Sequence, residues 1–226
     1  MKLFRYGGAL LFLLSLLSMP LIYLFRLGTP APNDGSVVRD AVSNVVLFTV
    51  FALHHSGMAR AGAKAWIARH APAELERSIY VWIASLLFLA VCLRWQPLPG
   101  IVWQVRGPGL MLYLTQLFGV ALTLAAARVV GVRELAGLTQ PDPAQSVEFR
   151  VNGPFGVVRH PIYLGWVLMV FATPVLTTSR LQFALISTLY LVAAIPLEER
   201  SLVDAFGDKY RVYQKQVRWR LVPGVW

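Results

Sequence analysis

Six stretches of this sequence contain no Asp, Glu, Lys or Arg and are long enough to cross a lipid bilayer. A membrane-spanning helix needs about 17–25 predominantly apolar residues. The charge-free intervals are 6–25, 41–59, 78–93, 107–127, 160–179 and 181–197. The third and sixth are short, with 16 and 17 residues, and would borrow flanking residues or be shielded by protein. Only Arg180 separates the last two intervals, which predicts a tight helical hairpin. We therefore expect an all-α integral membrane protein with about six transmembrane helices.

The composition of the 226 residues agrees with this class. Hydrophobic residues make up 57% and charged residues 14%, whereas soluble domains average about 45–50% and about 25%. This balance excludes intrinsic disorder, which requires low hydrophobicity and many charges. The net charge of +10 needs no nucleic-acid partner, because membrane proteins concentrate Lys and Arg in cytoplasmic loops. A single cysteine, Cys92, excludes a disulfide framework and a thiolate zinc site.

The distribution of Lys and Arg predicts the orientation of the chain. The N-terminus and the segments 60–77, 128–159 and 198–226 contain 16 of these residues, and the remaining segments contain 5. The positive-inside rule places the richer set in the cytoplasm. We therefore expect both termini on the cytoplasmic side of the inner cell membrane, with residues 1–226 forming a single polytopic membrane domain.

Polar residues suited to binding collect at the predicted cytoplasmic helix ends. At the start of the fifth interval, Pro161 fits the first position of a helix, and its neighbours Arg159, His160 and Tyr163 lie within one turn. A helix N-terminus favours an anion, and a guanidinium binds a carboxylate or phosphate bidentately. Gly165 leaves room for a planar ligand or a neighbouring helix. The alternative is that Arg159 and Tyr163 anchor the chain at the interface and His160 is a polar helix-entry residue.

Two adjacent carboxylates, Glu198 and Glu199, follow the sixth interval. Acidic residues contribute little to orientation, so we expect these two to bind ligand hydroxyls, to stabilise a cation or to pair with Arg159. An apolar stripe with helical spacing follows them, formed by Phe206, Tyr210, Tyr213 and Val217. It predicts a C-terminal amphipathic helix that lies in the headgroup region or folds back as a lid.

A third group, His54, His55 and Arg60, lies at the cytoplasmic end of the second interval. Structural hydrogen bonding, substrate binding and ligation of haem or a metal all remain open for the two histidines. The chain has 4 histidines, too few for the multi-histidine di-iron sites of membrane desaturases. We assign no metal site.

The C-terminal third resembles the isoprenylcysteine carboxyl methyltransferase superfamily over about residues 153–217. The resemblance rests on two ordered motifs, Arg159-His160-Pro161-x-Tyr163-x-Gly165 and Glu198-Glu199-x-x-Leu202-x-x-x-Phe206-Gly207-x-x-Tyr210-x-x-Tyr213. In the N-terminal half, His55-Ser56-x-Met58-Ala59-Arg60 and Arg94-Trp95-x-Pro97 are similar to the methanethiol S-methyltransferase branch, which is close to the NnrU-like proteins.

This resemblance implies a membrane methyltransferase that takes its methyl group from S-adenosylmethionine and methylates a small hydrophobic thiol, such as methanethiol. It implies catalytic roles for Arg159 and Glu199, and acceptor binding by His55 and Arg60. The implied donor-binding residues are His160, Pro161, Tyr163, Gly165, Glu198 and Tyr210. The active site would face the cytoplasm, membrane lipids would be the other partners, and we expect no obligate protein partner.

Three alternatives remain at the level of the sequence. The same donor could serve a prenylated thioether carboxylate or another lipid-like acceptor. The paired histidines and the likeness to NnrU leave open a non-enzymatic protein linked to haem or nitrogen oxides. A transporter is disfavoured, because pumps and channels usually carry charged residues inside their spans.

Overall fold

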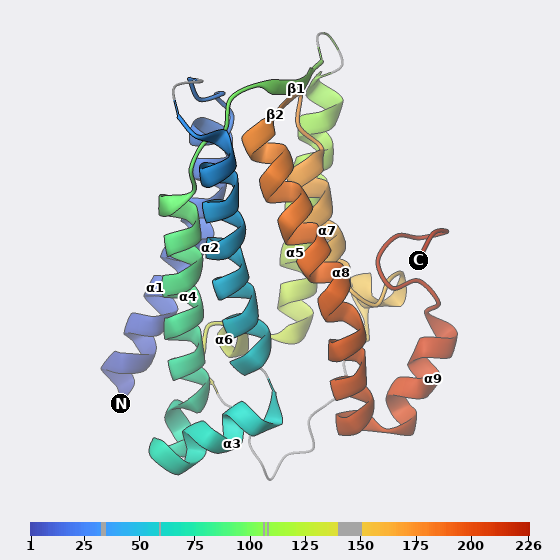
Figure 1. Cartoon of the computed structure of the whole chain (residues 1–226). Coiled ribbons are helices and arrows are strands. Elements are labelled where there is room, and N and C mark those ends of the chain that lie inside the picture. Colours follow the sequence, from blue (N-terminus) through green and yellow to red (C-terminus); the bar gives the residue numbers. More distant parts are fainter. Residues whose placement is uncertain (33–34, 59, 106, 108, 140–150) are drawn as a thin grey trace. The chain divides into compact units, whose positions relative to one another are not determined.

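The computed structural model describes residues 1–32, 35–58, 60–105, 107, 109–139 and 151–226 (Figure 1). The elements in chain order are α1 (Lys2–Leu21), the π-helix η1 (Ile22–Arg26), α2 (Val37–Met58), α3 (Ala61–His70), the 3-10 helix η2 (Ala73–Leu75), α4 (Glu76–Arg94), β1 (Ile101–Gln104), α5 (Gly109–Val130), α6 (Val132–Leu135), the 3-10 helix η3 (Gly153–Gly156), α7 (Pro161–Phe171), β2 (Val175–Thr177), α8 (Thr178–Phe206) and α9 (Asp208–Gln216). The chain divides into two compact units. The first contains α1 to α4, α6 and the start of α8, and the second contains α5, α7, the rest of α8 and α9.

Among the described residues, five helices are long and apolar enough to cross a membrane, namely Lys2–Arg26, α2, α4, α5 and α8. They coincide with five of the six predicted intervals, which confirms a multi-pass membrane protein. The remaining interval, 160–179, contains the 11 residues of α7, which rise about 16 Å, and reaches the start of α8 at Thr178. The pairing of β1 with β2 is a further departure from a purely helical chain. The count of six crossings and the single domain stay predictions.

In the first unit, α4 packs against α1 and α2. Gly7 and Gly8 of α1 lie against the indole of Trp82, whose Nε1 donates to the Phe4 carbonyl at 2.9 Å. Asn44 of α2 is fully buried and exchanges two hydrogen bonds with the backbone of Gln96, which follows α4. These contacts satisfy buried polar groups, as an apolar environment requires.

The start of α8 is fixed in the first unit by a buried arginine. Arg180 donates from Nε to the Tyr23 carbonyl and from Nη2 to the Leu24 carbonyl, both at 3.0 Å. Both carbonyls belong to η1, where the wider π-helical turn changes the hydrogen-bond pattern of the backbone. The sequence predicts a loop charge that separates two spans, but the structure buries this side chain to 6% exposure.

In the second unit, α5 and α7 run side by side (Figure 1). Gly165 allows this close packing, because a Cβ there would lie 2.6 Å from the Gly119 carbonyl oxygen and would overlap the hydroxyl of Thr123. Of the two reasons that the sequence offers for Gly165, the neighbouring helix is therefore the one that the structure shows. A contact of this glycine with the donor stays a prediction.

The backbone that follows α7 is irregular, and its carbonyls are satisfied within the second unit. Gln116 of α5 donates to the Met169 carbonyl at 2.8 Å. The indole of Trp103 donates to the Thr173 carbonyl at 3.0 Å, and the Val105 amide donates to the Pro174 carbonyl at 2.8 Å. Irregular backbone at membrane depth requires such partners, so these bonds make a short helix compatible with a bilayer.

The contact at Gly165 predicts the effect of a single methyl group. Alanine favours a helix by about 1 kcal/mol over glycine, but a backbone carbonyl cannot move away from the added Cβ. We expect Gly165→Ala to destabilise the protein by about 1–3 kcal/mol, measured as a lower thermal unfolding temperature in detergent. Gly156→Ala is the matched control, because a Cβ there meets nothing within 4 Å. Equal unfolding temperatures for the two variants would contradict this packing.

Candidate functional site

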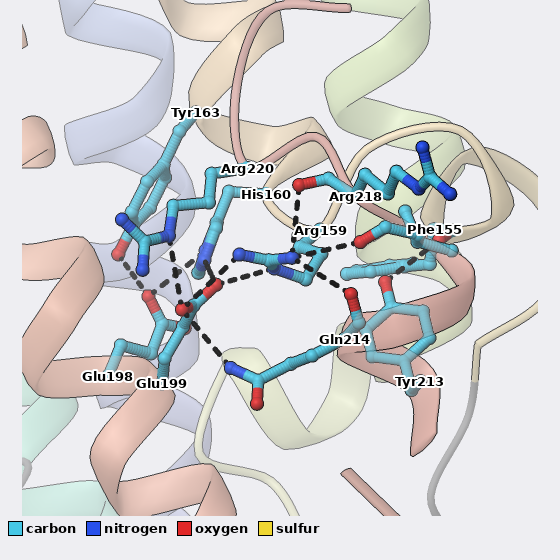
Figure 2. A network of polar contacts seen from close by, with 11 residues as sticks. Phe155, Arg159, His160, Tyr163, Glu198, Glu199, Tyr213, Gln214, Arg218 and Arg220 are labelled. Atoms are coloured by element: carbon cyan, nitrogen blue, oxygen red, sulfur yellow. Dashed lines mark hydrogen bonds and ion pairs between the residues drawn. The ribbon is translucent and has the colours of Figure 1, made fainter. Parts of the chain in front are cut away.

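The polar residues of the second unit gather where the start of α7, the end of α8, α9 and the C-terminal tail (residues 217–226) meet (Figure 2). We call this group the polar cluster. Its members are Arg159, His160, Tyr163, Glu198, Glu199, Gln214 and Arg220. Pro161 occupies the first helical position of α7 and His160 precedes it as the N-cap, as the sequence predicts.

A buried ion pair forms the centre of the polar cluster. Arg159 donates to Glu199 from Nε at 2.6 Å and from Nη2 at 3.5 Å. The exposed fraction of the side chain is 7% for Arg159 and 5% for Glu199. The pairing of the arginine with an acidic residue is one of the alternatives that the sequence leaves open for Glu198 and Glu199.

The remaining donors of Arg159 hold the C-terminal tail. Its Nη1 lies 2.9 Å from the Val217 carbonyl, 3.1 Å from the Arg218 carbonyl and 3.4 Å from the Gln214 carbonyl. The backbone amides of Arg159 and His160 donate to the carbonyls of the tail residues Trp219 and Arg220, each at 2.9 Å. The sequence predicts that the start of α7 and the Arg159 guanidinium bind an anion. In the structure, these donors bind carbonyls of the protein itself.

His160 lies between the two carboxylates. Its Nδ1 is 3.5 Å from Glu198 Oε2, and its Nε2 is 3.3 Å from Glu199 Oε1. Burial lowers the pKa of His160, but the hydrogen bonds and charges of the two glutamates outweigh burial and raise that pKa above its usual value. Only the imidazolium form donates from both ring nitrogens. The Tyr163 ring stacks on His160, and its hydroxyl donates to Glu198 at 2.7 Å.

The apolar stripe of α9 packs on the protein. Tyr210, Tyr213 and Val217 are buried, and the partly buried residues around them are Val151, Leu202, Val203 and Phe206. Burial raises the pKa of Tyr213 to about 12 and also raises that of Tyr210. The structure thus shows that the stripe packs on the protein; the placement of this helix in the headgroup region or as a lid stays a prediction.

The polar cluster has a buried layer and an exposed layer. Arg159, His160 and Glu199 are buried, whereas Glu198 and Arg220 keep 44% and 35% of their side-chain surface exposed. Arg220 Nε lies 3.3 Å from Glu199 Oε2, and Gln214 donates to the same oxygen at 3.3 Å. The sequence analysis missed Gln214 as a site residue, because it lies in α9 outside the apolar stripe. It missed Arg220 because a tail without periodicity gives no signal beyond its positive charge.

The predicted acceptor residues belong to the first unit. His55 Nδ1 lies 2.9 Å from the Tyr80 hydroxyl, and Arg77 lies over the Tyr80 ring at 5.1 Å. The Arg60 side chain is exposed. Binding of an acceptor by His55 and Arg60 stays a prediction. In the described ranges, no three His, Cys, Asp or Glu residues form a group that could hold a metal ion.

The fold and site define a multi-pass helical membrane protein with a charged cluster where one apolar helix begins and another ends. The chain matches the family described as "Protein of unknown function (DUF1295)" over residues 64–217. It is 37% identical to Methanethiol S-methyltransferase 1 of Bradyrhizobium diazoefficiens over 193 residues, which cover 82% of this chain and 68% of that protein.

Two further relatives carry the same enzyme name. The Methanethiol S-methyltransferase of Mycobacterium tuberculosis is 40% identical over 187 residues, covering 79% of this chain and 77% of that protein. The enzyme of Pseudomonas deceptionensis is 41% identical over 182 residues, covering 77% and 70%. The chain therefore belongs to the DUF1295 family and to the family of these methyltransferases, which confirms the predicted enzyme class. A methyltransferase requires a methyl donor and an acceptor. No solved structure matches the chain.

The two layers of the cluster predict different effects for its two glutamates. Glu199→Gln leaves the buried Arg159 without its carboxylate, and breaking a buried pair costs about 3–5 kcal/mol. Glu198→Gln is the matched control, because exposed ion pairs contribute about 0–1 kcal/mol. We expect a large fall in the thermal unfolding temperature only for Glu199→Gln, followed by circular dichroism in detergent. Similar falls for both variants would contradict the division into layers.

Proposed function

We propose that this protein transfers the methyl group of S-adenosylmethionine to a small thiol, converting methanethiol to dimethyl sulfide. The observation that carries the proposal is the identity of 37%, 40% and 41% to three methanethiol S-methyltransferases over most of the chain. The polar cluster supports the choice of donor, because its exposed layer combines a cation with a carboxylate.

When bound, S-adenosylmethionine supplies a sulfonium methyl group that is already an activated electrophile. The acceptor sulfur, as a thiolate, forms the new S–C bond. The donor sulfur keeps the electron pair of the S–CH₃ bond that breaks, and the thiol proton passes to water. The protein has to align the two sulfur centres and favour the thiolate. A free thiol has a pKa near 8.5, so a protonated His160 would increase its ionised fraction.

The geometry supports distinct roles within the polar cluster. Arg159 and Glu199 are buried and bonded to each other and to the tail, which supports positioning roles in place of direct contact with the reacting atoms. Glu198, Tyr163 and His160 lie next to one another, and we assign them to donor binding. Two further predicted residues, Pro161 and Tyr210, would act by setting the start of α7 and by packing α9.

The proposed topology has six crossings, with both termini and the polar cluster on the cytoplasmic side of the inner membrane. The segment from α7 to β2 would provide the fifth crossing, with its irregular part covered by α5 and its preceding loop. The excess of Lys and Arg in the segments that would then be cytoplasmic supports this orientation.

A reporter fused after Trp226 tests the topology. We expect green fluorescent protein at this position to fluoresce and alkaline phosphatase to be inactive, because only the former matures in the cytoplasm and only the latter requires export. A phosphatase fused after Gln104, in the short segment before α5, provides the opposite control and should be active. The reverse pattern at Trp226 would contradict the cytoplasmic placement of the polar cluster.

Purified protein with labelled S-adenosylmethionine and methanethiol tests the reaction. We expect labelled dimethyl sulfide, detected by gas chromatography. Loss of a hydrogen bond to a charged group costs about 1.5–3 kcal/mol, so Glu198→Gln should lower kcat/KM by about 10-fold to 100-fold. Asp208→Asn is the control, since this carboxylate is 92% exposed at the start of α9 and pairs with Arg211.

The choice of acceptor is tested in the same assay. Transfer to a prenylated thioether carboxylate, but not to any small thiol, would replace methanethiol with a lipid-like acceptor. Folded protein that transfers label to none of these acceptors would contradict the proposed reaction.

A further inference from the structure

We infer that Arg220 binds the carboxylate of the methyl donor, which makes the C-terminal tail a part of the donor site. The inference rests on the proposed function, because S-adenosylmethionine ends in an amino-acid group with one carboxylate and one ammonium. It assigns to Arg220, in the tail, the role of carboxylate-binding guanidinium that the sequence analysis gives to Arg159.

The contacts of the two arginines distinguish their roles. Arg159 is buried and directs its donors to Glu199 and to tail carbonyls, so binding a ligand would require it to release the tail. Arg220 is partly exposed and approaches Glu199 most closely through Nε. Within the described part of the chain, the terminal nitrogens of Arg220 make no hydrogen bond. They are the donors of the cluster that remain for an anion.

The surroundings of Arg220 suit a ligand that carries both charges. Figure 2 shows its guanidinium on the same side of the cluster as Tyr163 and Glu198, while the side chain of Arg218 points away from the cluster. A guanidinium binds a carboxylate bidentately, and the exposed carboxylate of Glu198 is the complementary group for an ammonium. One cation and one anion side by side therefore match the two charges of an amino-acid group.

Arg220 is held in place before any ligand binds. Its carbonyl accepts a hydrogen bond from the His160 amide at 2.9 Å. Its guanidinium lies 5.3 Å from the centre of the Trp226 ring, within the range of a cation–π interaction. Arg159 fixes the tail residues just before it through the Val217 and Arg218 carbonyls. This preorganisation makes Arg159 a positioning residue for Arg220.

The test compares Arg220→Gln with Arg218→Gln, which removes the same charge two residues away on the same tail. Isothermal titration measures the affinity for S-adenosylmethionine and for its decarboxylated analogue, which lacks only the carboxylate. We expect Arg220→Gln to weaken binding of S-adenosylmethionine by about 10-fold to 100-fold and Arg218→Gln by less than about threefold. The wild type should bind the decarboxylated analogue more weakly, and Arg220→Gln should bind both compounds equally.

This double comparison isolates the contact between one side chain and one ligand group. A wild-type preference for the carboxylate that survives in Arg220→Gln would overturn the inference and leave the proposed function intact. An equal loss in Arg218→Gln would also overturn it, because the effect would then be a general one of charge. Folded wild-type protein that binds no S-adenosylmethionine would overturn the proposed function as well.

A second variant covers the case in which Arg220→Gln does not fold. Arg220→Lys keeps the charge near Glu199 but loses the bidentate fork. We expect it to weaken S-adenosylmethionine binding and to leave binding of the decarboxylated analogue unchanged. Unchanged binding of both compounds would contradict a direct contact.

Discussion

The rest of the site depends on the buried ion pair between Arg159 and Glu199. Removing two charges from water costs several kcal/mol for each, and their attraction offsets this cost only when the other donors and acceptors are also satisfied. Here His160 and Gln214 donate to the carboxylate, while the guanidinium donates to one carbonyl of α9 and two carbonyls of the tail. One interaction therefore joins the start of α7, the end of α8 and the tail, and it determines which groups remain at the surface.

The membrane helices are predictable from sequence because a segment that crosses the hydrocarbon core must be apolar along its length, which is a local property of composition. The residues that end α7 are not predictable in this way, since Trp103 and Gln116 reach its last carbonyls from distant positions. Arg180 is a second case in which partners from distant positions decide the outcome. A charge between two apolar intervals indicates a loop, yet the carbonyls of η1 provide enough acceptors to bury it, and no local pattern predicts those acceptors.

The motifs around Arg159 and Glu198 indicate correctly which segments come together, but not which side chain is buried. Consecutive residues on a helix point about 100° apart, so Glu198 and Glu199 cannot both point toward Arg159. The position of Arg159 decides that Glu199 is the inner one. Arg220 has no such motif, because its place in the cluster follows from backbone bonds between the tail and the start of α7.

The balance of charges in the polar cluster indicates which charge a ligand has to carry. Arg159 balances Glu199, and the raised pKa of His160 favours a cation that balances Glu198. Arg220, which lies 3.3 Å from the already paired Glu199, then leaves the cluster with an excess of positive charge on its exposed layer. Because the buried layer holds these groups in fixed positions, they need little reorganisation when a charged ligand arrives. The excess positive charge on the exposed layer therefore favours a ligand that brings a carboxylate to it, which is the charge that the inferred contact with Arg220 requires.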